Sequence, residues 1–225
     1  MIIFIHIAKT GGATLNGILE TVYKNEYFRV KLPAFASDIN YCRANPHKCV
    51  SGHFSYGIHN DLGAKDYRYI TLLRNPVQKV KSYYYYMRFR DNKKMGEHHL
   101  DIAAKKSTLA QFAALEFTEL DNEMIRKLIP NPPGYGEINH IHLEQAVENL
   151  QNITFGITEK YETSLGLFEN VLNWEKIPDY EKRNISKNKK PMNDDEMELI
   201  AGINSYDLQL YEYAVNNFES QFIEE

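Results

Sequence analysis

The first two dozen residues constrain the fold most, because an apolar run, a glycine-containing turn and an amphipathic stretch follow one another directly. Residues 2–7 are rich in β-branched and aromatic side chains without polar alternation, which is typical of a strand covered on both faces. Ala8-Lys9-Thr10-Gly11-Gly12 interrupts this run. Apolar residues then recur at helical spacing, which predicts a helix over 13–24. The chain is therefore expected to open as strand, turn and helix.

The rest of the sequence repeats this alternation. Strand patterns occur at 50–54, 69–73 and 153–157, and helical patterns at about 76–90, 107–117, 119–129, 140–151, 159–172 and after Asn193. Strands that alternate with helices indicate an α/β protein with a largely parallel sheet. Because there is no internal repeat and no low-complexity linker, we expect a single domain over residues 1–225.

The charge balance narrows the classes of partner. Lys and Arg number 26 against 30 Asp and Glu, which gives a net charge of -4 and a pI near 6.1. A general nucleic-acid binder is more often basic, so no nucleic-acid partner is expected and any polyanion site must be local. The segment 74–94 is such a local concentration, with seven basic residues against Asp91 alone.

Features of targeting and metal binding are absent from the sequence. No apolar run approaches the roughly 20 residues of a membrane helix, and the apolar start lacks the basic region of a signal peptide. Cys42 and Cys49 form no C-x-x-C pair, and the histidines are scattered. We therefore expect free thiols, no metal site, no membrane anchor and a cytoplasmic location.

Lys9-Thr10-Gly11-Gly12 lies where a phosphate-binding loop would be found. Glycines let backbone N–H groups approach an anion, the helix N-terminus adds its positive dipole end, and Lys9 adds a point charge. Thr10 and Thr14 supply hydroxyl donors. From this segment alone, a phosphate loop and a plain glycine-rich turn remain equally good interpretations.

A Walker A motif does not fit, because Lys9 precedes the glycines and no glycine lies upstream. Kinases of that class also place a carboxylate for magnesium at a strand end, where this chain has Arg74. Arg74 and Ser82, about two turns into the next helix, could instead hold a second phosphate. A kinase is disfavoured but remains an alternative.

Three segments in this order resemble the carbohydrate sulfotransferases that use 3′-phosphoadenosine 5′-phosphosulfate (PAPS). They are Phe4-Ile5-His6-Ile7-Ala8-Lys9-Thr10-Gly11-Gly12-Ala13-Thr14, then Gly52-His53-Phe54-Ser55-Tyr56-Gly57, then Arg74-Asn75-Pro76 with Ser82. Weaker matches are Asp121-Asn122 with Arg126-Lys127-Leu128, and Asp207-Leu208-Gln209-Leu210-Tyr211. More narrowly, the set resembles sulfotransferase family 2, which includes heparan sulfate 2-O-sulfotransferase. Ala8 and Ala13 depart from the family pattern, where proline and a hydroxyl residue are usual.

The resemblance implies a P-loop-like three-layer sandwich with a central, mostly parallel sheet flanked by helices. It implies PAPS as co-substrate, no metal, and a hydroxyl acceptor that is a glycan. The residues it assigns to the nucleotide are Lys9, Thr10, Gly11, Gly12, Ala13, Thr14, Arg74, Ser82 and Lys187.

Two residues are expected to be catalytic. Lys9 would contact the bridging oxygen of the donor, and His53 would act as the base, since histidine suits proton transfer near neutral pH. His59 is the second candidate for the base, and His6 is expected to be a core residue. The alternatives that remain are a kinase of a small hydroxyl substrate and a nucleotide-binding module without chemistry.

Overall fold

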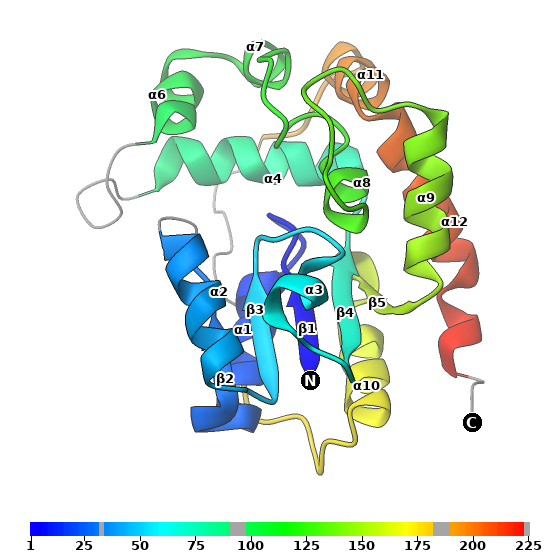
Figure 1. Ribbon diagram of the computed structural model, residues 1–225. Helices are drawn as coiled ribbons and strands as arrows, with labels where there is room; N and C mark the ends of the chain where they lie inside the picture. The colour runs from blue at the N-terminus through cyan, green and yellow to red at the C-terminus, as the bar shows by residue number, and fades with distance from the viewer. Residues whose placement is uncertain (32–33, 91–97, 182–189, 223–225) are drawn as a thin grey trace.

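The computed structural model describes residues 1–31, 34–90, 98–181 and 190–222 (Figure 1). Its centre is a five-stranded sheet in the order β2-β3-β1-β4-β5, and every neighbouring pair is parallel. The strands are β1 (Ile2–Ile5), β2 (Tyr27–Arg29), β3 (Cys49–Gly52), β4 (Arg68–Leu73) and β5 (Ile153–Ile157). The α/β fold with a parallel sheet is thereby confirmed.

Side chains alternate between the two faces of the sheet and enter two different apolar cores. On β1, Ile3 and Ile5 join one core while Phe4 joins the other, and all three are fully buried. The missing polar alternation in the sequence reflects this burial on both faces.

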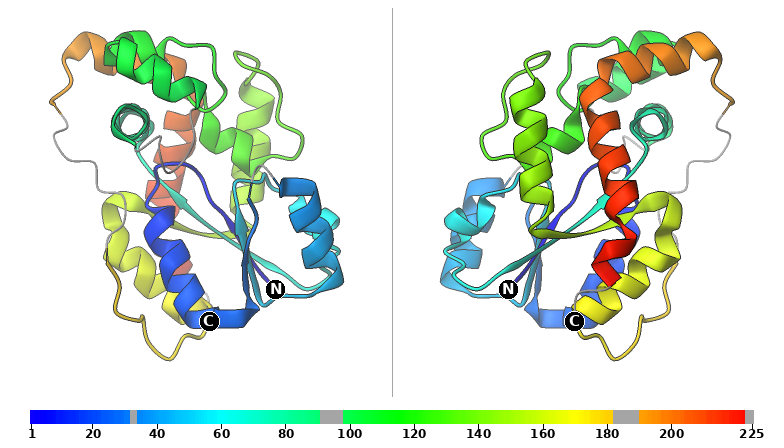
Figure 2. Two further views of the ribbon diagram at one scale, coloured as in Figure 1. Left: turned by 90° about the vertical axis from the view of Figure 1, so that its left-hand side faces the viewer. Right: turned by 90° about the vertical axis from the view of Figure 1, so that its right-hand side faces the viewer.

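Helices cover both faces of the sheet, which makes three layers (Figure 2). One face carries α1 (Gly12–Tyr23) and α10 (Tyr161–Val171), which share the core of Phe4. The other core takes side chains from α2 (Phe35–Ala44), α3 (Ile58–Leu62), α8 (Glu123–Leu128), α9 (His140–Leu150) and α12 (Ser205–Asn217). Short 3₁₀ turns lie at Lys24–Glu26, Thr158–Lys160 and Glu219–Phe222.

A further group of helices lies above the carboxyl ends of the strands (Figure 1). It comprises α4 (Pro76–Phe89), α6 (His99–Lys106), α7 (Leu109–Ala113) and α11 (Asp194–Ile203). This group of helices has an apolar cluster of its own, in which Tyr83, Tyr84 and Tyr85 of α4 are buried. Because parallel strands all end beneath this group, the space between the two is where a ligand would bind in an α/β protein.

Local signals placed several helix ends correctly. The Asn75 side chain accepts a hydrogen bond from the Gln78 amide ahead of Pro76, and Asn193 forms a capping box with Glu196. The expected helix at 119–129 begins only at Glu123, because Asn122 adopts a left-handed conformation with φ 44°. Helix α7 is likewise shorter than the expected 107–117.

Four elements were not expected from the sequence: β2, α2, α3 and α6. Each is short, and β2 has only three residues, so none shows a readable period. Cys42 lies on α2 and Cys49 on β3, and both are buried free thiols, as expected. Burial raises the pKa of the Cys42 thiol to about 11.

Candidate functional site

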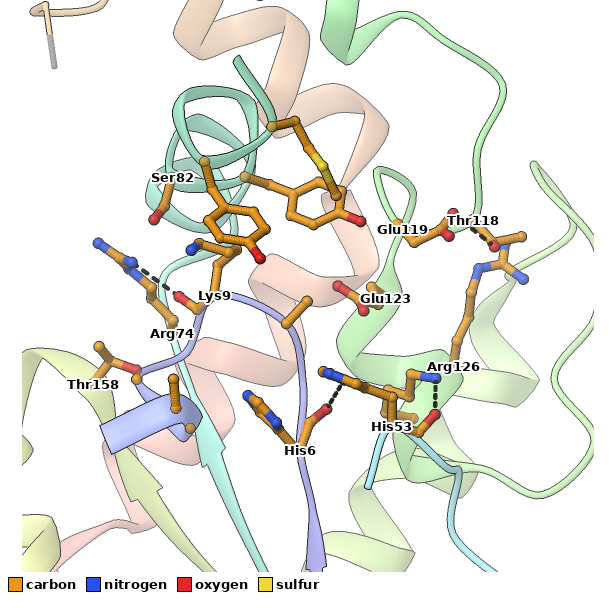
Figure 3. Close-up of a pocket in the computed structure, with 18 of the residues that line it drawn as sticks. His6, Lys9, His53, Arg74, Ser82, Thr118, Glu119, Glu123, Arg126 and Thr158 are labelled. Atoms are coloured by element: carbon orange, nitrogen blue, oxygen red, sulfur yellow. Dashed lines mark hydrogen bonds between the residues drawn. The ribbon is translucent and has the colours of Figure 1, made fainter. Parts of the chain in front are cut away.

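A cavity of about 840 Å³ lies between the carboxyl edge of the sheet and the helices above it (Figure 3). Segments that follow four strands contribute to its wall: the loop after β1, His53 after β3, Arg74 after β4 and Thr158 after β5. Helices α4 and α8 supply the opposite side. The parallel register brings these segments, far apart in sequence, to one edge.

The loop between β1 and α1 requires its two glycines. Gly11 has φ 86°, a left-handed conformation that side chains disfavour. A Cβ atom on Gly12 would lie 2.2 Å from the His6 ring. No side chain caps the N-terminus of α1, so its first N–H groups and the positive end of its dipole face the cavity.

Lys9 projects from this loop into the cavity (Figure 3). Its backbone is also left-handed, with φ 66°. Its Nζ atom lies 3.9 Å from the centroid of the Tyr86 ring, a cation–π contact. The Arg74 Nη1 atom donates a hydrogen bond to the Lys9 carbonyl oxygen at 2.9 Å, so the loop and β4 are tied together.

Thr10 is placed differently from the neighbouring loop residues. Gly11, Gly12, Ala13 and Thr14 line the cavity, whereas Thr10 does not. Its side chain is fully buried, and its hydroxyl donates to the Ile7 carbonyl oxygen at 2.9 Å. The hydroxyl proton is therefore engaged in closing the loop, and the expected role of the Thr10 side chain as an anion donor does not match this geometry.

Arg74 and Ser82 both line the cavity, as the spacing of the strand end and the helix predicts. Ser82 is buried on α4. The Arg74 Nε atom is buried without a hydrogen-bond partner in the part of the chain that the structure describes, and lies 3.9 Å from a Glu159 carboxylate oxygen. Burial lowers the pKa of Arg74, and Glu159 opposes that change. A guanidinium with an unused donor beside a buried serine suits an anion.

His53 lies across the cavity from the Lys9 loop (Figure 3). Its Nδ1 atom is 2.6 Å from the His6 carbonyl oxygen, which can only accept, so Nδ1 donates and neutral His53 has its lone pair on Nε2. Burial lowers the pKa of His53 below 6.5, while the Glu123 carboxylate raises it and the positive charge of Lys127 lowers it. His53 is therefore arranged as a neutral base near pH 7.

His6 and His59, the other two histidines weighed in the sequence, have different surroundings. The His6 ring is buried, stacks on His53 at a centroid distance of 4.3 Å, and its Nδ1 accepts from the Asn16 amide at 3.1 Å. Burial lowers the His6 pKa well below 6.5. His59 lies outside the cavity wall, and its Nδ1 is 2.9 Å from the Tyr69 hydroxyl. Of the two candidate bases, only His53 lines the cavity.

Sequence reasoning did not assign several residues that line the cavity. They include Arg29, Tyr86, Arg90, His98, Glu119, Glu123, Arg126, Lys127, Thr158 and Tyr161. Arg126 and Lys127 belong to a weak motif match on α8, which could have pointed to this wall. Arg90 belongs to the basic segment 74–94. No local pattern marks the remaining residues, because they come from separate elements that meet only in the fold.

The expected nucleotide contact of Lys187 and the expected absence of a metal site depend in part on residues that the structure does not describe. Lys187 lies outside the described residues, as do Lys93 and Lys94 of the basic segment. Within the described ranges, no group of three or more His, Cys, Asp or Glu side chains is arranged to hold a metal ion.

Comparisons with known proteins give distant matches. No family model matches the chain. Heparan-sulfate 6-O-sulfotransferase 3 of Mus musculus is 25% identical over 99% of this chain and 58% of its own length. Heparan-sulfate 6-O-sulfotransferase 1 of Homo sapiens is 24% identical over 99% of this chain and 66% of its own length. The chain thus spans about three fifths to two thirds of the curated relatives it matches.

Among solved structures, mouse sulfotransferase SULT7A1 complexed with PAP aligns with 89% of this chain and 62% of its own. The sequence identity is 17% and the TM-score is 0.46.

These matches refine one expectation and overturn another. Similarity to heparan-sulfate sulfotransferases is found, but the matching proteins are 6-O-sulfotransferases and not the 2-O enzymes that the motifs suggested. The expected cytoplasmic location is wrong on this comparison, because the heparan-sulfate 6-O-sulfotransferases are Golgi membrane enzymes. No helix in the described ranges is long and apolar enough to cross a membrane.

Proposed function

We propose that this protein transfers the sulfuryl group of PAPS to a hydroxyl group of a carbohydrate. The observation that carries the proposal is one cavity with two chemically different walls. An anion-binding wall contains the Lys9 loop, Arg74 and Ser82, and a facing wall contains His53 with its lone pair on Nε2. The similarity to curated heparan-sulfate 6-O-sulfotransferases supports the same reaction.

The donor would bind along the first wall. The N–H groups of Gly12 and Ala13 at the start of α1 would hold the 5′-phosphosulfate, with Thr14 beside them. Arg74, through its unpartnered Nε atom, and Ser82 would hold the 3′-phosphate. Thr10 would act by holding the shape of the loop, because its hydroxyl is bonded to Ile7 and it does not line the cavity.

In the reaction, the acceptor oxygen attacks sulfur in line with the bond to the 5′-phosphate. An O–S bond forms to the acceptor, the S–O bond to the phosphate breaks, and 3′,5′-ADP leaves. His53 Nε2 takes the proton of the acceptor hydroxyl. Lys9 stabilises the negative charge that develops on the bridging oxygen, an effect commonly worth about 3–4 kcal/mol per well-placed donor.

The acceptor is proposed to be a glycan, with the 6-hydroxyl of a hexosamine as the first position to test. The printed names of the relatives motivate this choice. A cavity of about 840 Å³ is large enough for the nucleotide together with a sugar unit.

The test measures transfer of labelled sulfate from PAPS to heparosan, chitin oligosaccharides and simple glycosides. A matched binding experiment compares 3′,5′-ADP with 5′-AMP, which differs only in lacking the 3′-phosphate. We expect 3′,5′-ADP to raise the melting temperature more than 5′-AMP, and Arg74→Ala to remove that difference. If the protein distinguished the two nucleotides no better than Arg74→Ala does, the assignment of the 3′-phosphate would be wrong.

The same experiments separate the alternative functions. A kinase would hydrolyse ATP in a magnesium-dependent manner and leave PAPS intact. A nucleotide-binding module would bind 3′,5′-ADP tightly and transfer sulfate to none of the acceptors. Sulfate transfer that depends on His53 would contradict both alternatives.

A further inference from the structure

A buried carboxylate faces the space where the acceptor would lie. Glu123 is the first residue of α8, lines the cavity, and is only 5% exposed. Figure 3 shows its carboxylate pointing into the centre of the cavity, between Lys9 and His53. A carboxylate in such a position is unexpected beside a site for an anionic donor, and the sulfuryl-transfer chemistry above does not use it.

The negative charge of Glu123 is held in place by a buried lysine. Lys79 Nζ lies 2.5 Å from Glu123 Oε2 and also donates to the Glu119 carbonyl oxygen at 3.3 Å. Lys79 is 1% exposed and does not line the cavity. The Glu123 carboxylate therefore faces the cavity, while the Lys79 ammonium group that balances its charge lies behind it.

The second oxygen of Glu123 has unused capacity to accept hydrogen bonds. Oε2 faces Lys79, whereas Oε1 accepts no hydrogen bond from any residue of the described ranges. Of the two oxygens only Oε2 is fully buried, so Oε1 is open to the cavity that Glu123 lines. A ligand hydroxyl group at this place would supply the missing donor.

Two cations of α8, Arg126 and Lys127, also line the cavity and differ in how their charge is balanced. Lys127 Nζ donates to the His53 carbonyl oxygen at 2.8 Å, and Arg126 forms an ion pair with Asp121 at 2.5 Å. Asp121 balances the charge of Arg126, whereas Lys127 is bonded to a neutral carbonyl and attracts Glu123 through its remaining charge. A second carboxylate, Glu119, lines the same wall but is more exposed.

We propose that Glu123 is a specificity-determining residue that accepts a hydrogen bond from a second hydroxyl group of the acceptor sugar, close to the hydroxyl that His53 deprotonates. This inference rests on the proposed function. It implies an acceptor whose sugar ring is uncharged at that second position. A sulfate or carboxylate there would face a buried like charge, which such a site rejects more strongly than a missing hydroxyl.

The experiment uses p-nitrophenyl N-acetyl-β-D-glucosaminide and analogues with the 3- or 4-hydroxyl replaced by hydrogen or by sulfate. For the unmodified protein we expect one of the two positions to be sensitive. There, kcat/KM should fall about tenfold for the deoxy analogue and further for the sulfated one. Glu123→Gln should relieve the penalty for sulfate by at least tenfold, because the side chain keeps its size and loses its charge.

Two further variants make the result interpretable. Glu119→Gln removes a carboxylate from the same wall and should leave the discrimination unchanged. Lys79→Met combined with Glu123→Gln removes both buried charges, so it should melt near the temperature of the unmodified protein even if Glu123→Gln alone unfolds. The double variant should show the same relief of the sulfate penalty.

The outcomes distinguish a failure of the Glu123 assignment from a failure of the proposed function. Equal penalties in the unmodified protein and in the Glu123 variants, at both positions, would overturn the role of Glu123 and leave sulfuryl transfer standing. Failure of the unmodified protein to sulfate any of these glycosides or heparosan would count against the proposed function itself.

Discussion

Asn122 and Asp207 cap each other's helices. The Asp207 carboxylate accepts hydrogen bonds from the Met124 and Ile125 amides at the start of α8, each at 2.9 Å. The Asn122 side-chain oxygen accepts from the amide of Asp207, at 2.9 Å, at the start of α12. Since α8 holds Glu123 and Lys127 against the cavity, this reciprocal pair positions one wall of the site.

Asp207→Ala should therefore destabilise the protein by about 2–3 kcal/mol, because it leaves two buried amides without an acceptor. Urea unfolding at pH 7.5 measures the change in the free energy of unfolding. Asp195→Ala, an exposed first-turn aspartate of α11, is the control and should change stability by less than about 0.5 kcal/mol. Equal effects of the two substitutions would contradict the capping role.

The glycine at position 12 gives a second prediction. Gly12→Ala places a Cβ atom 2.2 Å from the His6 ring, so the loop or the ring must move. We expect at least a tenfold loss of affinity for 3′,5′-ADP, measured by calorimetry. Gly202→Ala is the matched control, because nothing lies within 4 Å of its Cβ position on α11. It should leave binding unchanged and be neutral or slightly stabilising.

The anion-binding wall could be predicted from the sequence because its parts are local. A strand, a turn and a helix that follow one another place Lys9 and Gly11 at a helix N-terminus without knowledge of the rest of the fold. Arg74 and Ser82 lie eight residues apart, across one strand end and two helical turns, and both line the cavity. In both cases the local strand and helix pattern was sufficient to predict that these residues lie together at the site.

The acceptor wall could not be predicted in this way. Lys79 and Glu123 are 44 positions apart, and nothing in either segment indicates that the two form an ion pair at 2.5 Å. Charged side chains are mostly exposed in proteins, whereas both members of this pair are buried. For Thr10 the sequence pattern predicts a hydroxyl that binds an anion, and in the structure that hydroxyl donates to Ile7.

His53 gives a prediction of pH dependence. Burial disfavours the charged imidazolium and lowers the His53 pKa below 6.5, so the base is unprotonated at pH 7. The logarithm of kcat/KM for sulfate transfer should be flat above pH 6.5 and fall with unit slope in acid, with its midpoint below 6.5. A midpoint clearly above 6.5 would argue against this residue as the base.

Substitution of the same residue tests its role directly. His53→Ala should lower kcat by about 10²–10⁴-fold. The affinity for 3′,5′-ADP should change less than twofold, because the His53 ring does not belong to the anion-binding wall. His59→Ala is the control, since His59 lies outside the cavity wall, and it should retain normal turnover. Loss of activity in His59→Ala alone would reverse the assignment of the two histidines.

Lys9 gives the last prediction. Its ammonium group lies against the Tyr86 ring, within the cavity and next to the start of α1. Lys9→Ala should lower kcat by about 10²–10³-fold, because the negative charge that develops on the leaving oxygen loses a preorganised cation. Lys81→Ala, on α4 but outside the residues that line the cavity, removes an equal charge and should change kcat less than twofold. Single-turnover kinetics with labelled PAPS distinguishes the two, and similar rates for both variants would show that Lys9 does not act on the leaving group.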